Sequence, residues 1–374
     1  MRTRELIVAC VATLMLTGLV MVYSNTAVSC GLNPAANEFV AKQAMWVCLS
    51  LCAIMLFAHI DYHLLARHSR LIMLLTLLAL AVLLVAGTKR NGARRWFRLG
   101  PMSLQVSEFA KIAVVLFIAG FVSRKRAILG NLKRGFAPPV LILCAVFTLI
   151  MLQPDFGTAV LIMAVGMAML VCAGVCWKHS LLLAAAAAPL LFVFLRMSDY
   201  RWRRIIAFIT PWKDAKGLGY HVCQSLIALG SGGWTGVGPG RGLQKLGFLP
   251  EAETDFIFAI IGQETGLLGC LLLISVFAAL FYAGMRVCRA APDVLGGVLA
   301  LGVTLLIGLQ MFINVAVAAS AMPTKGISLP FVSFGGSSLL AFSIGVGILL
   351  NVSRQCPRDD LPAIRGARAR ETAT

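Results

Sequence analysis

The chain has 374 residues, of which 59% are hydrophobic and only 13% are charged, and its mean hydropathy is +0.89. A water-soluble domain could hardly bury so much apolar surface in one core, so a soluble globular class is excluded. The formal net charge of +18 at pH 7 comes from 33 Lys and Arg against 15 Asp and Glu. The composition therefore predicts a polytopic membrane protein with basic loops.

A membrane-spanning helix needs about 20 mostly apolar residues. Along the chain this rule predicts ten spans, at residues 5–24, 43–60, 71–87, 107–123, 138–152, 157–174, 181–197, 257–283, 296–320 and 338–352. The first follows Arg2 and Arg4, as in a signal peptide, but its apolar run continues without a small-residue cleavage site. We therefore expect an all-α polytopic bundle of about ten transmembrane helices, with a large extracytoplasmic loop between helices 7 and 8.

Basic residues in short loops predict orientation, because Lys and Arg resist translocation. They gather in alternate loops on the side that holds both termini, at Arg67, Arg70, Arg124, Lys125, Arg126, Lys133, Arg134, Arg286 and Arg289. That side is expected to be cytoplasmic. We predict one integral membrane domain over residues 1–353, followed by a basic cytoplasmic tail over residues 354–374.

Two loops on the opposite side break this pattern. Loop 88–106 contains Lys89, Arg90, Arg94, Arg95 and Arg98, and the long loop 197–256 adds seven more basic residues between Arg201 and Lys245. Long loops translocate regardless of charge, but loop 88–106 is short enough for the rule to apply. Two interpretations stay open: an exception without functional meaning, or a basic patch that binds a polyanion.

The outward loops also have unusual composition. Residues 94–99, Arg-Arg-Trp-Phe-Arg-Leu, mix aromatic and cationic side chains, so this segment is expected to lie along the membrane surface. Loop 197–256 is rich in glycine, which predicts a close-packed or re-entrant backbone beside protein or a wet cavity. Residues 323–338 combine Pro and Gly with hydroxyl groups. The outward ends are therefore predicted to enclose something polar.

Ionisable residues beside apolar spans are functional candidates, because charge at that depth is costly. Asp255 ends a polar loop and runs directly into apolar sequence. Glu108 and Lys111 are spaced to share one helix face, where the alternative is an ion pair worth a few tenths of a kcal/mol if exposed. Asp155 follows a Gln-Pro step and is expected to cap the next helix.

Four segments together resemble the SEDS family (shape, elongation, division and sporulation) of bacterial membrane glycosyltransferases. They are residues 107–111, Ser-Glu-Phe-Ala-Lys; 153–158, Gln-Pro-Asp-Phe-Gly-Thr; 250–259, from Pro250 to Ala259; and 329–338, from Leu329 to Ser338. The likeness covers most of the chain. Residues 324–330, Thr-Lys-Gly-Ile-Ser-Leu-Pro, resemble the FtsW branch of the family more than the RodA branch.

The resemblance implies ten spanning helices in the bacterial cytoplasmic (inner) membrane and a site that faces the periplasm. It also implies polymerisation of lipid II, an undecaprenyl-pyrophosphate-linked disaccharide peptide, into β-1,4 glycan strands during cell division. The implied partners are a class B penicillin-binding transpeptidase, other divisome proteins and membrane lipids, and no nucleic acid. Some members of the family suggest a divalent cation at the pyrophosphate, but no metal site can be derived from this sequence.

By the same resemblance, Asp255 matches the family's essential aspartate. It is expected to accept the proton of the acceptor sugar's 4-hydroxyl as that oxygen attacks the donor's anomeric carbon, with inversion and loss of the lipid pyrophosphate. Lys111 is expected to neutralise the leaving pyrophosphate, and Glu108 to orient Lys111. Trp96 matches an aromatic beside the basic loop, with interface anchor as the alternative. Further candidates for substrate contact are Arg95, Arg98, Arg241, Lys325 and Ser333, the last with a helix cap as the alternative.

The chain departs from the family pattern at three places. Val106 stands where proline is usual, Phe334 where tyrosine is usual, and Gln263 with Glu264 where two adjacent acids are common. The third departure puts the ligands of a cation in doubt. Two other functions stay open on the sequence alone. One is a lipid II flippase or transporter, although no inverted repeat is evident. The other is a non-catalytic division scaffold, against which the intact Asp255 and Lys111 argue.

Overall fold

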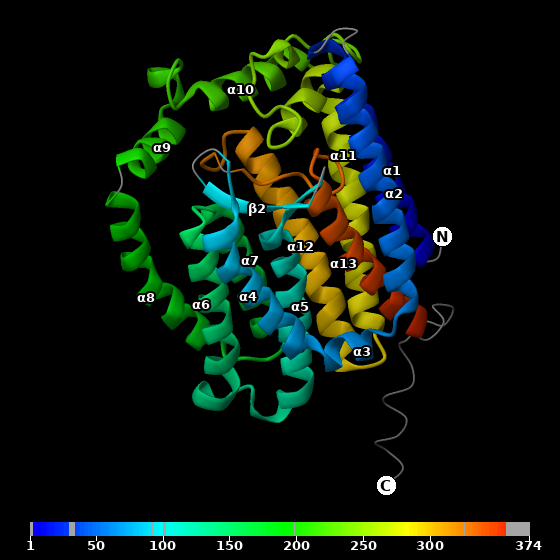
Figure 1. Cartoon of the computed structure of the whole chain (residues 1–374), viewed down its shortest axis with the longest axis vertical. Coiled ribbons are helices and arrows are strands. Elements are labelled where there is room, and N and C mark those ends of the chain that lie inside the picture. The colour runs from blue at the N-terminus through cyan, green and yellow to red at the C-terminus, as the bar shows by residue number, and fades with distance from the viewer. Residues whose placement is uncertain are drawn as a thin grey trace, which may run out of the picture.

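The computed structural model describes residues 3–29, 34–90, 93–99, 102–197, 199–324 and 326–356. Long helices run roughly side by side along the long axis of the molecule (Figure 1). Within the described residues, eight helices are long and apolar enough to cross a membrane. The polytopic helical membrane fold predicted from the composition is therefore confirmed.

The eight spans correspond to α1 (Thr3–Ser29), α2 (Pro34–His59), α4 (Ser69–Ala86), α5 (Val106–Lys125), α6 (Ala137–Leu152), α11 (Ile257–Ala290), α12 (Val294–Ala318) and α13 (Gly336–Gln355). Two more helices, α7 (Phe156–Cys172) and α8 (Trp177–Arg196), coincide with the sixth and seventh predicted spans. Each predicted span thus corresponds to a helix, and the number ten for those that cross the membrane stays a prediction.

Helices α5, α12 and α13 form the buried centre of the bundle. Their spans are 78%, 61% and 78% buried, whereas those of α2 and α4 are 17% and 22% buried. Helix α4 accordingly leaves Leu71, Leu74 and Leu75 exposed, as lipid-facing residues are. Since charge is costly against lipid, the buried centre is where polar side chains can be held.

Loop 88–106 folds into a small antiparallel sheet rather than only lying along a surface. Strands β1 (Thr88–Arg90), β2 (Ala93–Leu99) and β3 (Met102–Gln105) pair in the order β1-β2-β3. The sheet is joined to the start of α13, where the Ser337 hydroxyl accepts from Gln105 N at 3.0 Å and donates to Ser103 O at 3.1 Å. In Figure 1, β2 lies across one end of the bundle.

Loop 197–256 contains more regular structure than its glycine content predicts. It forms α9 (Asp199–Ile209), the 3₁₀ turn η3 (Pro211–Asp214), α10 (Tyr220–Gly232) and the 3₁₀ turn η4 (Gln244–Leu246). Between α10 and η4 the backbone is irregular, and Gly236 has a φ of +81° that side-chain-bearing residues rarely adopt. At the other end of the bundle lie α3 (Tyr62–Arg67), the 3₁₀ turn η1 (Arg126–Ile128) and the π-helical turn η2 (Leu132–Phe136).

Candidate active site

The charged pair on α5 is buried. Lys111 Nζ donates to Glu108 Oε1 at 2.7 Å, and the two side chains are only 2% and 8% exposed. The pair is therefore not exposed, and the weak coupling expected for an exposed ion pair does not apply. Removal of either partner would leave a buried unpaired charge, which costs several kcal/mol. The second carboxylate oxygen, Glu108 Oε2, has no hydrogen-bond partner among the described residues.

Gln310 on α12 extends this pair toward the segment before α13. Its Oε1 accepts from Lys111 Nζ at 2.8 Å, and its Nε2 donates to Ser328 O at 2.8 Å. The Ser328 and Ser338 hydroxyls lie 3.1 Å apart. Gln310 is fully buried, so its amide is committed to holding Lys111 and residue 328 in place.

Asn314 lies one turn further along α12 and holds the aspartate segment. Its Nδ2 donates to Asp255 O at 2.9 Å and to Ile327 O at 2.7 Å. Residues four apart on a helix share one face. Gln310 and Asn314 therefore place the Lys111 ammonium and the Asp255 backbone about one helical turn apart. Neither amide was among the predicted site residues, although a Gln and an Asn one helical turn apart in an apolar span are a recognisable pattern in the sequence.

Asp255 is half-buried at the end of a tight turn that precedes α11. Its N–H donates to Glu251 O at 3.1 Å, and Glu251 has a φ of +54°, an uncommon conformation for a residue with a side chain. A Cβ placed on Gly326 would lie 3.0 Å from Asp255 Oδ2. The backbone at Gly326 therefore passes directly beside the carboxylate, and a larger residue there would crowd it.

Ser333 bonds the two loop segments of the site together. Its hydroxyl donates to Thr254 O at 2.5 Å and accepts from Leu329 N at 2.7 Å. Next to it, Phe334 N donates to Glu253 O at 2.8 Å. These bonds fix residues 251–256 against residues 327–334, so Ser333 acts on the site through the backbone that it holds.

Three predicted substrate-binding residues lie on β2. Arg95 donates from Nε to Gln153 O at 2.9 Å and from Nη2 to Pro154 O at 2.6 Å, which joins the sheet to the turn between α6 and α7. Trp96 is half-buried. Arg98 is exposed near the end of the strand. Of the two arginines, Arg98 keeps its guanidinium exposed, whereas Arg95 is bonded to backbone.

Asp155 caps α7 as expected, because its Oδ1 accepts from Thr158 N at 3.3 Å. Its Oδ2 accepts from Gln105 Nε2 at 3.5 Å. Burial raises the pKa of Asp155, while the positive charges of Arg95 and Lys111 and the Thr158 hydrogen bonds oppose that rise. Asp155 thus connects the sheet, the α6–α7 turn and the pair on α5 into one polar region.

A second buried ion pair holds the glycine-rich segment between α10 and η4. Lys245 pairs with Glu264 of α11, and their side chains are 0% and 1% exposed. Lys245 Nζ also donates to Ser24 Oγ at 2.8 Å, and Gly240 N donates to Glu264 Oε2 at 3.2 Å. This pair was not predicted, because the two residues lie in segments that the sequence does not relate.

Two predicted residues, Arg241 and Lys325, and the possible divalent cation lie outside the contacts described so far. Arg241 is exposed in the same segment, and Lys325 lies outside the described residues. Throughout the described part of the chain, no three His, Cys, Asp or Glu side chains lie close enough together to hold a metal ion by themselves. The carboxylate of Glu264 is already paired with Lys245. The described residues therefore contain no preformed cluster of three such ligands, and a divalent cation held by the pyrophosphate together with one or two carboxylates stays a prediction.

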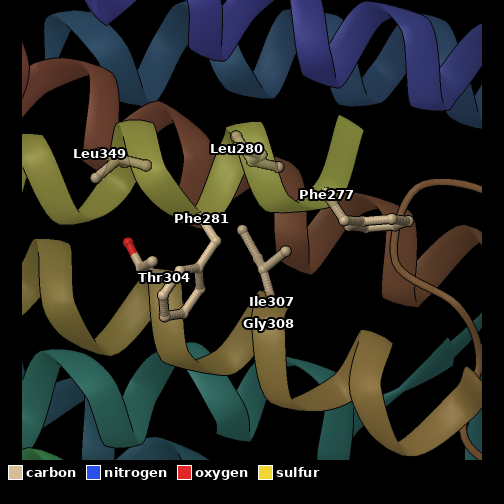
Figure 2. Close-up of a pocket in the computed structure, with 7 residues that line it drawn as sticks. All are labelled: Phe277, Leu280, Phe281, Thr304, Ile307, Gly308 and Leu349. Carbon is tan, nitrogen blue, oxygen red and sulfur yellow. The ribbon is translucent and has the colours of Figure 1, made fainter. Parts of the chain in front are cut away.

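A small cavity between α11 and α12 is separate from this polar region (Figure 2). Its volume is about 10 Å³, and its lining is apolar except for Thr304, whose hydroxyl donates to Ala300 O at 2.6 Å. A cavity of this size holds one water molecule at most. It is a gap in the packing of the spans, too small for a substrate.

Known proteins are similar in sequence to this chain over nearly its whole length. The family model described as "cell cycle protein", which covers FtsW, RodA and SpoVE, matches residues 4–357. A probable peptidoglycan glycosyltransferase FtsW of Aliivibrio salmonicida (strain LFI1238) is 39% identical over 347 residues, which are 92% of this chain and 87% of that protein. Stage V sporulation protein E of Bacillus subtilis (strain 168) is 37% identical over 354 residues, which are 94% of this chain and 97% of that protein.

Solved structures share the fold. A chain from a peptidoglycan synthase complex, described for its structural coordination of polymerization and crosslinking, has a TM-score of 0.78 and 27% identity, and the match covers 93% of this chain and 96% of that one. The rod shape determining protein RodA of Thermus thermophilus has a TM-score of 0.68 and 26% identity, with 94% and 97% covered. Sequence and structure agree on one set of relatives, and the chain therefore belongs to the FtsW/RodA/SpoVE family.

Proposed function

We propose that this protein polymerises lipid II into β-1,4 glycan strands on the outer face of the cytoplasmic (inner) membrane during cell division. Its family and the names of its relatives make it a peptidoglycan glycosyltransferase, and its apolar helices make it a multi-pass membrane protein. The observation that carries the reaction is the α12 face on which Gln310 holds Lys111 and Asn314 holds Asp255. This arrangement supports a site that combines a base on the Asp255 segment with the Lys111 cation, because neighbouring residues of one helix face hold the Asp255 backbone and the Lys111 ammonium.

The reaction needs both groups. The 4-hydroxyl oxygen of the acceptor sugar forms a bond to the donor's anomeric carbon, and the bond from that carbon to the pyrophosphate oxygen breaks with inversion. The Asp255 carboxylate accepts the hydroxyl proton, and the electron pair of the broken bond leaves on the lipid pyrophosphate. General-base assistance of this kind contributes about 10²–10⁴-fold.

Lys111 is suited to the departing pyrophosphate. An ammonium group has three N–H donors. Two are committed, to Glu108 Oε1 and to Gln310 Oε1. We assign the third to a pyrophosphate oxygen, so that Glu108 and Gln310 orient the ammonium. Arg98 and Arg241, both exposed, supply positive charge for the incoming diphosphate.

The solved synthase complex supports the choice of partner. Its description joins polymerization with crosslinking, and the matched chain has the fold of this protein. We propose a class B penicillin-binding transpeptidase as the partner, with other divisome proteins around it. The orientation with both termini in the cytoplasm rests on the basic residues of the short loops.

Polymerisation of labelled lipid II tests this function. Purified protein with a bound class B transpeptidase should form glycan strands, resolved by length on a gel. Asp255→Asn should make at least about 100-fold fewer strands, because an amide of similar volume cannot accept the proton. Asp214→Asn, the same chemical change at an exposed position of the same loop, serves as the control and should behave as wild type.

Two results would contradict the proposal. Near-normal strands from Asp255→Asn would remove the base from the mechanism. An absence of strands from wild type, with the partner verified as bound, would argue against a polymerase and for transport or scaffolding.

A further inference from the structure

Helix α3 lies at the end of the bundle away from β2 (Figure 1), and residues of α3 line a basic pocket there. It is open, has a volume of about 370 Å³, and is formed by α3, the start of α4, the end of α5 and the start of α12. Its charged and polar lining consists of His63, Arg67, Arg70, Ser123 and Arg124, and none of the described residues that line it is acidic. We call this site the basic pocket.

The Arg124 side chain is built into the wall of the pocket. Its Nη1 donates to Ala66 O at 3.2 Å and its Nη2 to Ser69 Oγ at 3.5 Å. A Cβ placed on Gly120 would lie 2.7 Å from Ser69 Oγ and 3.2 Å from Arg124 Nη1. The glycine therefore leaves room for the guanidinium between α5 and α4. With five N–H groups, a guanidinium bonded in this way keeps further donors for a ligand.

The other cationic groups of the pocket are not neutralised by carboxylates of the described chain. The ion pairs formed by the described residues do not include Arg67 or Arg70, and both side chains are exposed. The two nearby carboxylates, Asp61 and Asp293, both bond to the imidazole of His63. Three guanidinium groups around one opening repel each other, and an anion placed among them relieves that repulsion.

The surroundings of the pocket favour a lipid over a soluble anion. Arg70 directly precedes the apolar part of α4, and Leu74 follows it by one helical turn on the same face. Leu71, Leu74 and Leu75 are 53%, 53% and 56% exposed, although they belong to a membrane-spanning helix. An anionic lipid whose headgroup lies at the arginines would place its acyl chains along these leucines. A free phosphate has no apolar part that could contact them.

We propose that the basic pocket binds the phosphate group of an anionic phospholipid, with Arg67, Arg70 and Arg124 donating to its oxygens. The planar guanidinium suits phosphate because it donates two parallel hydrogen bonds. Basic pockets between helices at the membrane surface are known to bind anionic head groups. This site is independent of the proposed polymerase chemistry, which lies at the other end of the bundle.

Native mass spectrometry of the purified full chain in detergent tests the proposal. Wild type, titrated with phosphatidylglycerol or with phosphatidylcholine of the same acyl chains, should bind the anionic lipid at least about tenfold more tightly. Arg67→Gln/Arg70→Gln should weaken phosphatidylglycerol binding about 30-fold, because two surface-level basic residues are lost. Arg126→Gln/Lys133→Gln removes the same charge from exposed residues outside the pocket, and should stay within about twofold of wild type.

Three other outcomes would overturn the pocket, the lipid or the guanidinium contacts of the proposal. Equal weakening in both double variants would show diffuse surface charge in place of a pocket. Displacement of phosphatidylglycerol by inorganic phosphate at similar concentration would assign the pocket to a soluble anion. Should the glutamine variant fail to fold, Arg67→Lys/Arg70→Lys keeps the charge and removes the planar fork. It should bind several-fold more weakly, and unchanged binding would reject the guanidinium contacts.

Discussion

At the residue scale, the buried Lys111–Glu108 pair combines a structural and a chemical contribution that single substitutions cannot separate. Removal of one partner leaves the other charge buried and unpaired, which costs about 3–5 kcal/mol. Replacement of both by well-packed hydrophobic residues of similar volume is often neutral for stability or even stabilising. A double substitution therefore isolates the chemistry of Lys111 from its part in folding.

We expect Lys111→Met to lose both thermal stability and polymerisation. Lys111→Met/Glu108→Met should recover much of the melting temperature, although Gln310 Oε1 loses its donor, while strand synthesis stays about 100-fold below wild type because the donor for the leaving group is still absent. Melting in detergent and synthesis from labelled lipid II give the two readouts. Recovery of synthesis together with stability would show that the pair serves only the fold.

Charge in an apolar context was the signal available from the sequence at this scale. It drew attention to Asp255, Glu108 and Lys111, and the hydrogen bonds of α12 bring these three residues into one polar region. The expectations for Arg95 and Ser333 had no such basis. Their bonds to backbone carbonyls cross 58 and 79 residues of sequence, and no local pattern contains such contacts.

At the scale of elements, two buried amides hold segments that lie outside their own helices. Asn314 of α12 bonds to the backbone at Asp255 and Ile327. Asn351 of α13 donates to Ala58 O at 2.9 Å and accepts from Tyr62 N at 3.1 Å, near the other end of the bundle. The two asparagines make similar contacts, but only the first touches the segment that carries the proposed base.

Asn314→Leu should lower kcat for polymerisation by about 10–100-fold, because the Asp255 segment loses its anchor and small misplacements of a catalytic group are costly. KM for lipid II should change little. Asn351→Leu is the matched control, since it also removes two buried bonds to backbone outside its helix and leaves Tyr62 N unpaired, at about 1–3 kcal/mol, while Ala58 O keeps its bond from Arg354. Its melting temperature should fall similarly while kcat is kept. Equal loss of kcat in both variants would point to general destabilisation.

The helices were predictable and the sheet was not. Runs of about 20 apolar residues give a strong signal, and every predicted span corresponds to a helix. Strands β1, β2 and β3 have only 3, 7 and 4 residues. Arginines beside aromatic residues occur both in short strands and in segments that lie along a membrane surface, so this pattern does not distinguish the two. The sheet depends on contacts such as those of Ser337 with β3, which join segments more than 200 residues apart.

At the scale of the whole molecule, polar side chains gather at the two ends of an apolar bundle. The end with β2 holds the proposed chemistry. At the other end, His63 of α3 bonds through Nδ1 to Asp61 at 2.8 Å and through Nε2 to Asp293 at 2.9 Å. Asp293 also caps α12 through Gly296 N and accepts from the Tyr62 hydroxyl. This cluster therefore joins α3 to the start of α12.

The protonation of His63 should make the stability of the bundle depend on pH. Burial lowers the pKa of His63, but hydrogen bonds and charge interactions with Asp61 and Asp293 outweigh this effect, and the net pKa is raised. A raised pKa in the folded state means that folding favours the protonated form. The stabilisation is complete below the ordinary histidine pKa of about 6.5 and is lost as pH rises through the raised value.

The melting temperature of the wild type in detergent should therefore fall as pH rises from about 6 to 8.5, and His63→Gln should remove most of that slope. The effect should stay below about 1 kcal/mol, because His63 is about half exposed and solvent screens the pair. His59→Gln is the control, since His59 is exposed and, among the residues that the structure describes, its ring bonds only to Met55 O. A wild-type slope that persists in His63→Gln, or disappears equally in His59→Gln, would assign the pH dependence to other groups and leave the α3–α12 junction without a titrating contact.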